Sequence, residues 1–193
     1  MGKGIMINIV DNFLDDLTYI STYNKLLEND FEEVVIGDKS FWVQFSTPEF
    51  DKTILDKVSS IEGVERKSVL SFFRVATDEL DTDWRIHADS IINGERPTRA
   101  LVLNISPSKM TGLHGTAFWR HREYGDSLHD GVSFEDFDGM LLNDSNDLSK
   151  WDLQSVVGYK INRAVCYPCN YFHSKYPNIG WAAGRMVYVM FYK

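Results

Sequence analysis

The chain has 193 residues, of which 44% are hydrophobic and 13% aromatic, and this composition excludes a protein that is disordered throughout. Its 28 acidic residues outnumber its 20 basic residues and give a formal net charge of -8, so we expect neither nucleic acid nor an anionic membrane surface as a partner. The length predicts a single domain over residues 1–193.

The opening segment, MGKGIMINIVDNF, has neither a long apolar run nor a small-residue cleavage site, so we expect no secretory signal. No stretch of the sequence approaches the length of a membrane-spanning helix. These two observations predict a cytoplasmic protein without membrane contact.

The first predicted elements are a short strand, IMINIV, and a helix from residue 13 to about residue 28. Asp11 or Asn12 is a suitable N-cap for this helix. Its apolar stripe would comprise Phe13, Leu17, Ile20, Tyr23 or Asn24, and Leu27.

The segments FEEVVIGD and FWVQFS follow, and they predict a pair of strands joined by a turn at Gly37-Asp38. Pro48, after Thr47, marks the start of a second helix that ends at Gly63. The apolar stripe of this helix would comprise Phe50, Ile54, Leu55, Val58 and Ile61. We therefore expect residues 1–65 to provide helices and strands that support a sheet formed by the rest of the chain.

From Ser68 onward the sequence predicts short strands separated by turns. The runs RALVLNI, INRAVCY and MVYVMFY are rich in β-branched and aromatic residues, which suits strands buried on both faces. Many short strands without intervening helices indicate an α+β, mainly β fold of the sandwich or jelly-roll type. Residues 122–154 interrupt this pattern with many acidic residues, and they form either a lid over a functional site or a solvated excursion.

Three residues are candidate ligands of one metal ion: His87, Asp89 and His173. Residues two apart in an extended segment point to the same side, so His87 and Asp89 can converge on one point. His173 follows a turn that begins at Pro168 and can lift it out of a sheet. Two imidazoles and one carboxylate occupy one face of a ferrous ion and leave the opposite positions open. The alternative for His87 and Asp89 is the end of a surface strand.

Arg185 begins an apolar strand, GRMVYVMFYK, in which an uncompensated guanidinium is costly. Strand alternation groups Arg185 with Val187, Val189 and Phe191, so it faces the interior if those residues do. A buried arginine needs an anion, which is either a bound ligand or a carboxylate of the protein itself.

An ordered set of segments between Ser68 and Tyr192 resembles the Fe(II)- and 2-oxoglutarate-dependent oxygenase superfamily, especially its small prolyl-hydroxylase-like members. These segments are SVLSFFRVA, WRIHAD, TRALVLNIS, GTAFWRH, INRAVCYPCNYFHS and GRMVYVMFY. The resemblance implies a double-stranded β-helix (jelly roll, cupin-like) core over residues 66–193, with a lid insertion at 122–154 and the N-terminal helices packed on one sheet.

The same resemblance implies a chemistry and assigns residues to it. His87, Asp89 and His173 would bind Fe(II), and Arg185 would bind the distal carboxylate of the cosubstrate 2-oxoglutarate. With O2, the enzyme would hydroxylate an unidentified small-molecule or peptide substrate and release succinate and CO2. The alternative is a non-catalytic, cupin-like protein that binds a metal or a small molecule.

The sequence departs from one common version of the family pattern, because Val187 stands where Arg-x-Ser would supply a hydroxyl. The second contact to the 2-oxoglutarate carboxylate is therefore unassigned, with Asn104 or a tyrosine as candidates. Trp119 and Arg120 are candidate substrate contacts, although alternation places them on opposite faces of a strand.

Two further groups of residues are assigned structural roles. Cys166 and Cys169 could form a redox pair or half of a zinc site, but they close a strand and enter a turn, which favours a buried thiol plus a turn residue. His114, His121 and His129 are irregularly spaced, so we interpret them as ordinary exposed histidines.

Overall fold

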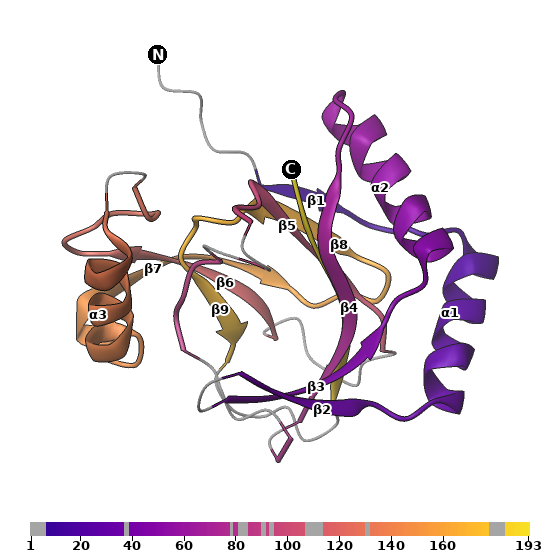
Figure 1. Ribbon diagram of the computed structural model, residues 1–193, viewed down its shortest axis with the longest axis horizontal. Coiled ribbons are helices and arrows are strands. Elements are labelled where there is room, and N and C mark those ends of the chain that lie inside the picture. Colours follow the sequence, from indigo (N-terminus) through magenta and orange to yellow (C-terminus); the bar gives the residue numbers. More distant parts are fainter. Residues whose placement is uncertain are drawn as a thin grey trace.

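The computed structural model describes residues 7–36, 39–77, 79–80, 85–89, 92, 95–106, 114–129, 132–177 and 184–193. Within these residues, the elements in chain order are β1 (Asn8–Val10), α1 (Asp16–Glu28), β2 (Glu32–Ile36), β3 (Lys39–Phe45), α2 (Pro48–Glu62), β4 (Ser68–Ala76), β5 (Arg99–Asn104), β6 (Gly115–His121), α3 (Phe134–Asp144), a 3₁₀ turn (Leu148–Lys150), β7 (Trp151–Gly158), β8 (Ala164–Pro168), β9 (His173–Tyr176) and β10 (Arg185–Tyr192). Helices α1 and α2 lie at one side of the molecule and α3 lies at the other (Figure 1).

The strands form two antiparallel sheets. A seven-stranded sheet has the order β1-β8-β5-β10-β4-β3-β2, and a three-stranded sheet has the order β7-β6-β9. The predicted mainly β core is therefore confirmed, and the short strands from β4 onward supply most of it. The N-terminal segment contributes β1, β2 and β3 to the edges of the large sheet, as well as two helices.

Both sheets contribute to one buried layer, which we call the interior cluster. Its buried members are Ala100, Val102, Phe118, Val157, Val165, Tyr167, Cys169, Val187, Val189 and Phe191. Along β10 these residues alternate with Tyr188 and Met190, which belong to the cluster beneath the helices. The central strands of the large sheet are thus buried on both faces, as their unbroken apolar runs predict.

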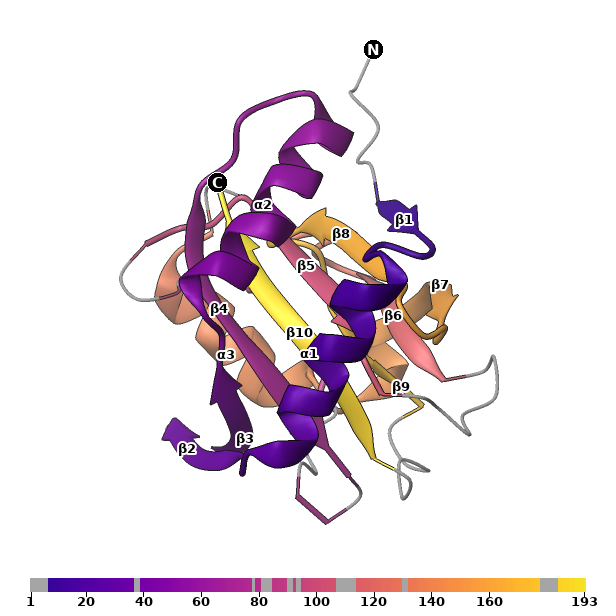
Figure 2. The same cartoon turned by 90° about the vertical axis from the view of Figure 1, so that its right-hand side faces the viewer.

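Helices α1 and α2 cover the outer face of the large sheet (Figure 2). Helix α2 begins and ends where the sequence predicts: the Thr47 side chain accepts a hydrogen bond from the Phe50 N–H, and Gly63 has φ +67° at the C-terminus. Its residues Ile54 and Val58 are fully buried against the sheet. The helical support expected from the first part of the chain is confirmed.

The predicted start of α1 is wrong, and its predicted apolar stripe is right only for Tyr23 and for Phe13, which is buried ahead of the helix. The N-cap is Asp15, not Asp11 or Asn12, and the side chain of Asp15 accepts from the Thr18 N–H. Phe13 and Leu14 precede the helix and are buried, with the Leu14 backbone held by the side chain of Asn162. This contact fixes the rotation of the helix. The face toward the sheet therefore carries Tyr19, Thr22, Tyr23 and Leu26, whereas Leu17, Ile20 and Leu27 are exposed.

The predicted strand pair after α1 is confirmed as β2 and β3, while its turn residues Gly37 and Asp38 lie outside the described residues. The described part of 122–154 contains α3, the 3₁₀ turn and the first residues of β7. Part of this segment is therefore strand of the small sheet, and its action as a lid stays a prediction. No helix among the described residues is both long and apolar enough to cross a bilayer.

Candidate functional site

The segment that contains His87 and Asp89 pairs with the start of β9. The His87 N–H donates to the His173 carbonyl at 3.0 Å, and the His173 N–H donates to the His87 carbonyl at 2.8 Å. The Asp89 N–H donates to the Cys169 carbonyl at 2.8 Å. This antiparallel bridge brings the two predicted ligand segments together, and His173 begins its strand as expected.

The side chains of His87, Asp89 and His173 converge. The distance from His87 Nε2 to Asp89 Oδ1 is 3.8 Å, and that from His173 Nε2 to Asp89 Oδ2 is 3.4 Å. One candidate ligand atom from each residue lies within 4.8 Å of the others. Ligand atoms held at right angles about 2.1 Å from one ion lie about 3 Å apart. The cluster therefore fits a divalent ion after small side-chain movements.

Hydrogen bonds orient both imidazoles toward the same point. His87 Nδ1 lies 3.0 Å from the Arg85 carbonyl, and His173 Nδ1 lies 2.9 Å from the Tyr171 carbonyl. A carbonyl oxygen only accepts, so Nδ1 carries the hydrogen in both rings and each Nε2 lone pair is directed to the cluster. Backbone carbonyls hold metal-binding histidines in this way in many proteins.

Burial makes this cluster unfavourable for charge. It lowers the pKa of His87 well below the usual value, with the nearby His173 adding to the effect, so the His87 ring is neutral at neutral pH. Burial also raises the pKa of Asp89, although His173 and Arg74 act in the opposite direction. A neutral imidazole is the form that binds metal, and a cation at this point would offset the burial of the carboxylate.

Arg185 faces the interior, as strand alternation predicts. Its side chain is buried at the start of β10, on the same face as Val187 and Val189 of the interior cluster. Its Nη2 lies 3.4 Å from the hydroxyl oxygen of Thr116, on the small sheet. The guanidinium thus lies between the two sheets, where an anionic ligand would be shielded from water.

Tyr167 lies beside the metal cluster; the sequence suggests a tyrosine as a candidate contact without indicating which one. It is only 2% exposed, and its ring lies 4.7 Å from that of His173, between centroids. Burial raises the pKa of this phenol well above its usual value, Asp89 raises it further and Arg185 lowers it. Its hydroxyl makes no hydrogen bond within the described residues. The hydroxyl is therefore available to a bound ligand or a water molecule.

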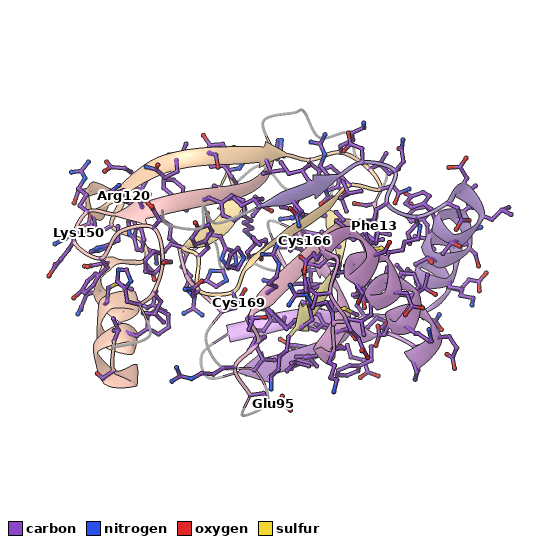
Figure 3. The ribbon with its side chains drawn as sticks, turned by 90° about the horizontal axis from the view of Figure 1, so that it is seen from above. Phe13, Glu95, Arg120, Lys150, Cys166 and Cys169 are labelled. Atoms are coloured by element: carbon purple, nitrogen blue, oxygen red, sulfur yellow. The ribbon has the colours of Figure 1, made fainter. Side chains whose placement is uncertain are left out.

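The remaining predicted contacts lie in different places. Asn104 is buried, and its amide donates to the Lys160 carbonyl at 3.1 Å. Trp119 is buried with Phe137 of α3 and donates to the Ser174 hydroxyl at 2.9 Å, on the face of β6 opposite Phe118. Arg120 is exposed at the α3 end of the small sheet (Figure 3). The ligand contacts suggested for Asn104, Trp119 and Arg120 stay predictions.

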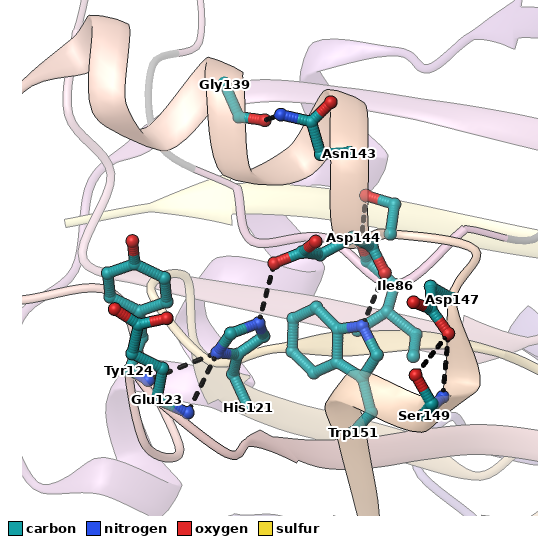
Figure 4. A network of polar contacts seen from close by, with 11 residues as sticks. Ile86, His121, Glu123, Tyr124, Gly139, Asn143, Asp144, Asp147, Ser149 and Trp151 are labelled. Carbon is teal, nitrogen blue, oxygen red and sulfur yellow. Dashed lines mark hydrogen bonds and ion pairs between the residues drawn. The ribbon is translucent and has the colours of Figure 1, made fainter.

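The interpretation of His121 as exposed is wrong, because its side chain is 1% exposed. Its Nδ1 accepts from the N–H groups of Glu123 and Tyr124 at 3.2 Å, and its Nε2 lies 3.1 Å from Asp144 Oδ2 (Figure 4). Since Nδ1 accepts, the hydrogen is on Nε2 and the ring is neutral. The tight turn after β6 buries the ring, and the ring anchors the end of α3. His129 is exposed and His114 is half-buried.

The structural interpretation of the two cysteines is confirmed. Both thiols are free and buried near the middle of the molecule (Figure 3). Burial raises the pKa of Cys166 to about 11 and raises that of Cys169 further. Neither thiol therefore has the lowered pKa of a redox pair.

Two antiparallel sheets around a buried layer, with a His-Asp-His cluster between paired segments, define a double-stranded β-helix protein with a candidate metal centre. No protein-family model matches the chain, and no curated protein matches it. Many solved structures resemble it, among them three that match nearly its whole length.

One is HygX from Streptomyces hygroscopicus with nickel, 2-oxoglutarate and hygromycin B bound: TM-score 0.62, 10% identity, covering 97% of this chain and 82% of HygX. Another is SnoK, a non-haem α-ketoglutarate-dependent carbocyclase from nogalamycin biosynthesis: TM-score 0.64, 13% identity, covering 97% of this chain and 79% of SnoK. The third is a Pseudomonas putida prolyl-4-hydroxylase: TM-score 0.58, 11% identity, covering 98% of this chain and 93% of the hydroxylase. At these identities the matches show the fold, so the predicted jelly-roll core is confirmed.

Proposed function

We propose that this chain is a non-haem Fe(II)- and 2-oxoglutarate-dependent oxygenase that hydroxylates a small molecule. The observation that carries the proposal is the convergence of His87, Asp89 and His173, with each Nε2 directed to the cluster. Two imidazoles and one carboxylate with open positions suit Fe(II) that must also bind other ligands. A structural zinc site would instead be closed by four protein ligands.

The chain also offers a place for an anionic cosubstrate. Arg185 provides a buried guanidinium whose planar donors match a carboxylate, and Thr116 lies beside it. Tyr167 belongs to the interior cluster and its ring lies beside that of His173, so we infer that its hydroxyl can donate to the same ligand. Tyr167 is thus our candidate for the contact that Val187 cannot provide, and we prefer it to Asn104, whose amide already donates to the Lys160 carbonyl.

These residues prepare a dry site. Val187, Val189 and Phe118 surround it with apolar surface, so its polar interactions are stronger than in water. When bound, iron and 2-oxoglutarate would supply the oxidative chemistry with O2, with release of succinate and CO2. The protein would fix the ligands, orient the cosubstrate through Arg185 and Tyr167, and exclude water from the reacting groups.

The class of substrate rests on similarity to other proteins of this fold. HygX has hygromycin B bound, and SnoK is named as a carbocyclase of nogalamycin biosynthesis, so two proteins of this fold are associated with small molecules. We extend that class to this chain, together with a cytoplasmic location. Such a site supports several oxidative reactions, and we propose hydroxylation as the one that this chain catalyses.

An anaerobic titration tests the metal site. Fe(II) and 2-oxoglutarate added to the wild-type chain should give the visible charge-transfer band of their complex. The variant Asp89→Asn should lose the band, whereas Asp152→Asn, which changes an exposed carboxylate paired with Arg122, should keep it. A folded, metal-loaded wild type without the band would contradict the proposal. Binding of both compounds without any release of succinate in air would favour the non-catalytic alternative.

Tyr167→Phe tests the cosubstrate contact. The change removes one hydrogen bond to a charged group, worth about 1.5–3 kcal/mol, so the Kd of 2-oxoglutarate measured from the same band should rise roughly 10- to 100-fold. The unliganded variant should unfold at the same or a higher denaturant concentration, because its lost hydroxyl had no protein partner. Unchanged affinity for 2-oxoglutarate would exclude Tyr167 from the site.

A further inference from the structure

A pocket of about 250 Å³ opens beside the metal cluster. Residues 96–98, before β5, form one side of it, residues of the 122–154 segment form the other, and Asp89 and Asn170 contribute to its lining. No part of the cosubstrate site around Arg185 lines this pocket. The pocket is therefore lined by the candidate metal ligand Asp89 but not by Arg185, Tyr167 or Thr116.

Part of the wall of this pocket is apolar. It includes Pro97 and Phe137, which are buried, together with Leu128 and Val132, which are half-buried. An aliphatic or aromatic group placed against these residues would be removed from water, and so would the apolar side chains that it contacts. Burial of such a group stabilises a complex by about 25 cal/mol per Å² of apolar surface.

Two of the polar lining residues are occupied by bonds within the protein. The amide of Asn170 donates to the Leu128 carbonyl at 3.0 Å, and the Thr98 hydroxyl donates to the Tyr192 carbonyl at 3.4 Å. These bonds stabilise the wall and leave the two residues fewer donors for a ligand. Specificity must then come from other polar groups at the pocket.

Arg96 and His129 are those groups. Both side chains are exposed, both line the pocket, and neither makes a hydrogen bond or an ion pair within the part of the chain that the structure describes. In a chain with 28 acidic and 20 basic residues, an arginine without a carboxylate partner at a pocket is informative. Its guanidinium offers two parallel donors to a carboxylate, and His129 can add a third.

We propose that this pocket binds the substrate, and that the substrate is a small carboxylic acid with an aliphatic or aromatic body. This inference rests on the proposed function, since the metal cluster defines which end of the pocket is reactive. The carboxylate contacts Arg96 and His129, and the apolar body lies between Phe137 and Val132 with its C–H bonds toward Asp89. A volume of about 250 Å³ is below the range for drug-sized ligands, so the acid has about the size of an amino acid.

Binding of matched probes tests this proposal without metal, cosubstrate or turnover. 4-Methylpentanoate and its neutral amide are titrated into the full chain and followed by ligand-observed NMR and calorimetry. The acid should bind at least tenfold more tightly than the amide, because only the acid makes charge-assisted hydrogen bonds. Arg96→Gln should remove this difference, and Val132→Trp, which fills the pocket, should abolish binding of both probes.

The control is Arg122→Gln, which removes an exposed arginine that is not part of the pocket and should leave both affinities unchanged. Equal binding of acid and amide would overturn the carboxylate assignment, and no binding of either would overturn the pocket itself. Tighter binding of a peptide that ends in leucine than of the free acid would overturn the small-molecule class. Because the probes need no iron, a failure of the oxygenase proposal would leave these results interpretable.

Discussion

The anchor between β6 and α3 makes a quantitative prediction about the charge on a buried histidine. His121 accepts two backbone N–H groups on Nδ1 and donates from Nε2 to Asp144, so the ring is neutral. In His121→Phe, the ring volume is nearly kept but all three bonds are lost. In Asp144→Asn, the side-chain carbonyl still accepts from Nε2, so only the charge of the carboxylate is lost.

The two variants should therefore differ in stability. Glu123 is exposed, so its N–H can form a hydrogen bond with water in the variant. Only the N–H of Tyr124 then loses its partner, at a cost of about 1–3 kcal/mol. The lost bond to the carboxylate adds about 1–2 kcal/mol, because Asp144 is 18% exposed. His121→Phe should then cost about 3 kcal/mol in the free energy of unfolding, or about 6–12 °C in Tm. Asp144→Asn should cost less than about 1 kcal/mol.

Urea unfolding followed by circular dichroism measures both values, with equal m-values as the check that the unfolding reaction is the same. If Asp144→Asn lost as much stability as His121→Phe, the ring would carry a charge that the carboxylate neutralises. That result would refute the assignment of the hydrogen to Nε2 and the account of the anchor built on it.

Further predictions concern a strand glycine, a buried thiol and a helix cap. Gly115→Ala places Cβ 2.0 Å from the Val157 carbonyl oxygen, so β6 and β7 must separate and the free energy of unfolding should fall by about 2 kcal/mol or more. The control is Gly139→Ala in α3, which has open space around it and should be neutral or stabilising in the same urea assay. The pKa of about 11 for Cys166 keeps its buried thiol neutral at pH 8, so iodoacetamide should label the native chain far more slowly than the unfolded chain. Because that pKa is raised on folding, the contribution of the thiol to stability is present below pH 9 and should be lost as the pH rises toward about 11. Thr47→Ala should cost about 1 kcal/mol through loss of the N-cap of α2, measured by thermal unfolding.

Local signals in the sequence predict much of this structure. Helix α2 has a capping threonine, a proline at its start and a glycine in a left-handed conformation at its end, so its boundaries depend on neighbouring residues alone. The strands of the core are unbroken apolar runs, and their alternation correctly places Val187 and Val189 in the interior. The convergence of His87, Asp89 and His173 is also as expected. The two-residue spacing of His87 and Asp89 is a local feature, whereas the joining of His173 to them, 86 residues away, is expected from the family resemblance of the surrounding segments.

Features set by distant contacts could not be predicted. The rotation of α1 depends on Asn162, which holds Leu14 from the other end of the chain, and no pattern within the helix reports that contact. Tyr167 looks like one more aromatic residue of a buried strand, and only its place beside His173 distinguishes it. A possible signal was its position directly before the turn that leads to His173.

The segment 122–154 shows why a composition rich in acidic residues and glycine is a poor guide to a role. The Ser145 hydroxyl donates to the Ile86 carbonyl at 2.8 Å, and the Ile86 N–H donates back to the Ser145 carbonyl at 3.2 Å, one residue before His87. The Leu128 N–H donates to the Asn170 carbonyl at 2.8 Å, close to His173. The insertion thus holds both segments that carry the candidate ligands. The insertion can thus maintain the geometry of the two ligand segments without moving as a lid would. Shortening the insertion should therefore weaken metal binding even when His87, Asp89 and His173 are unchanged.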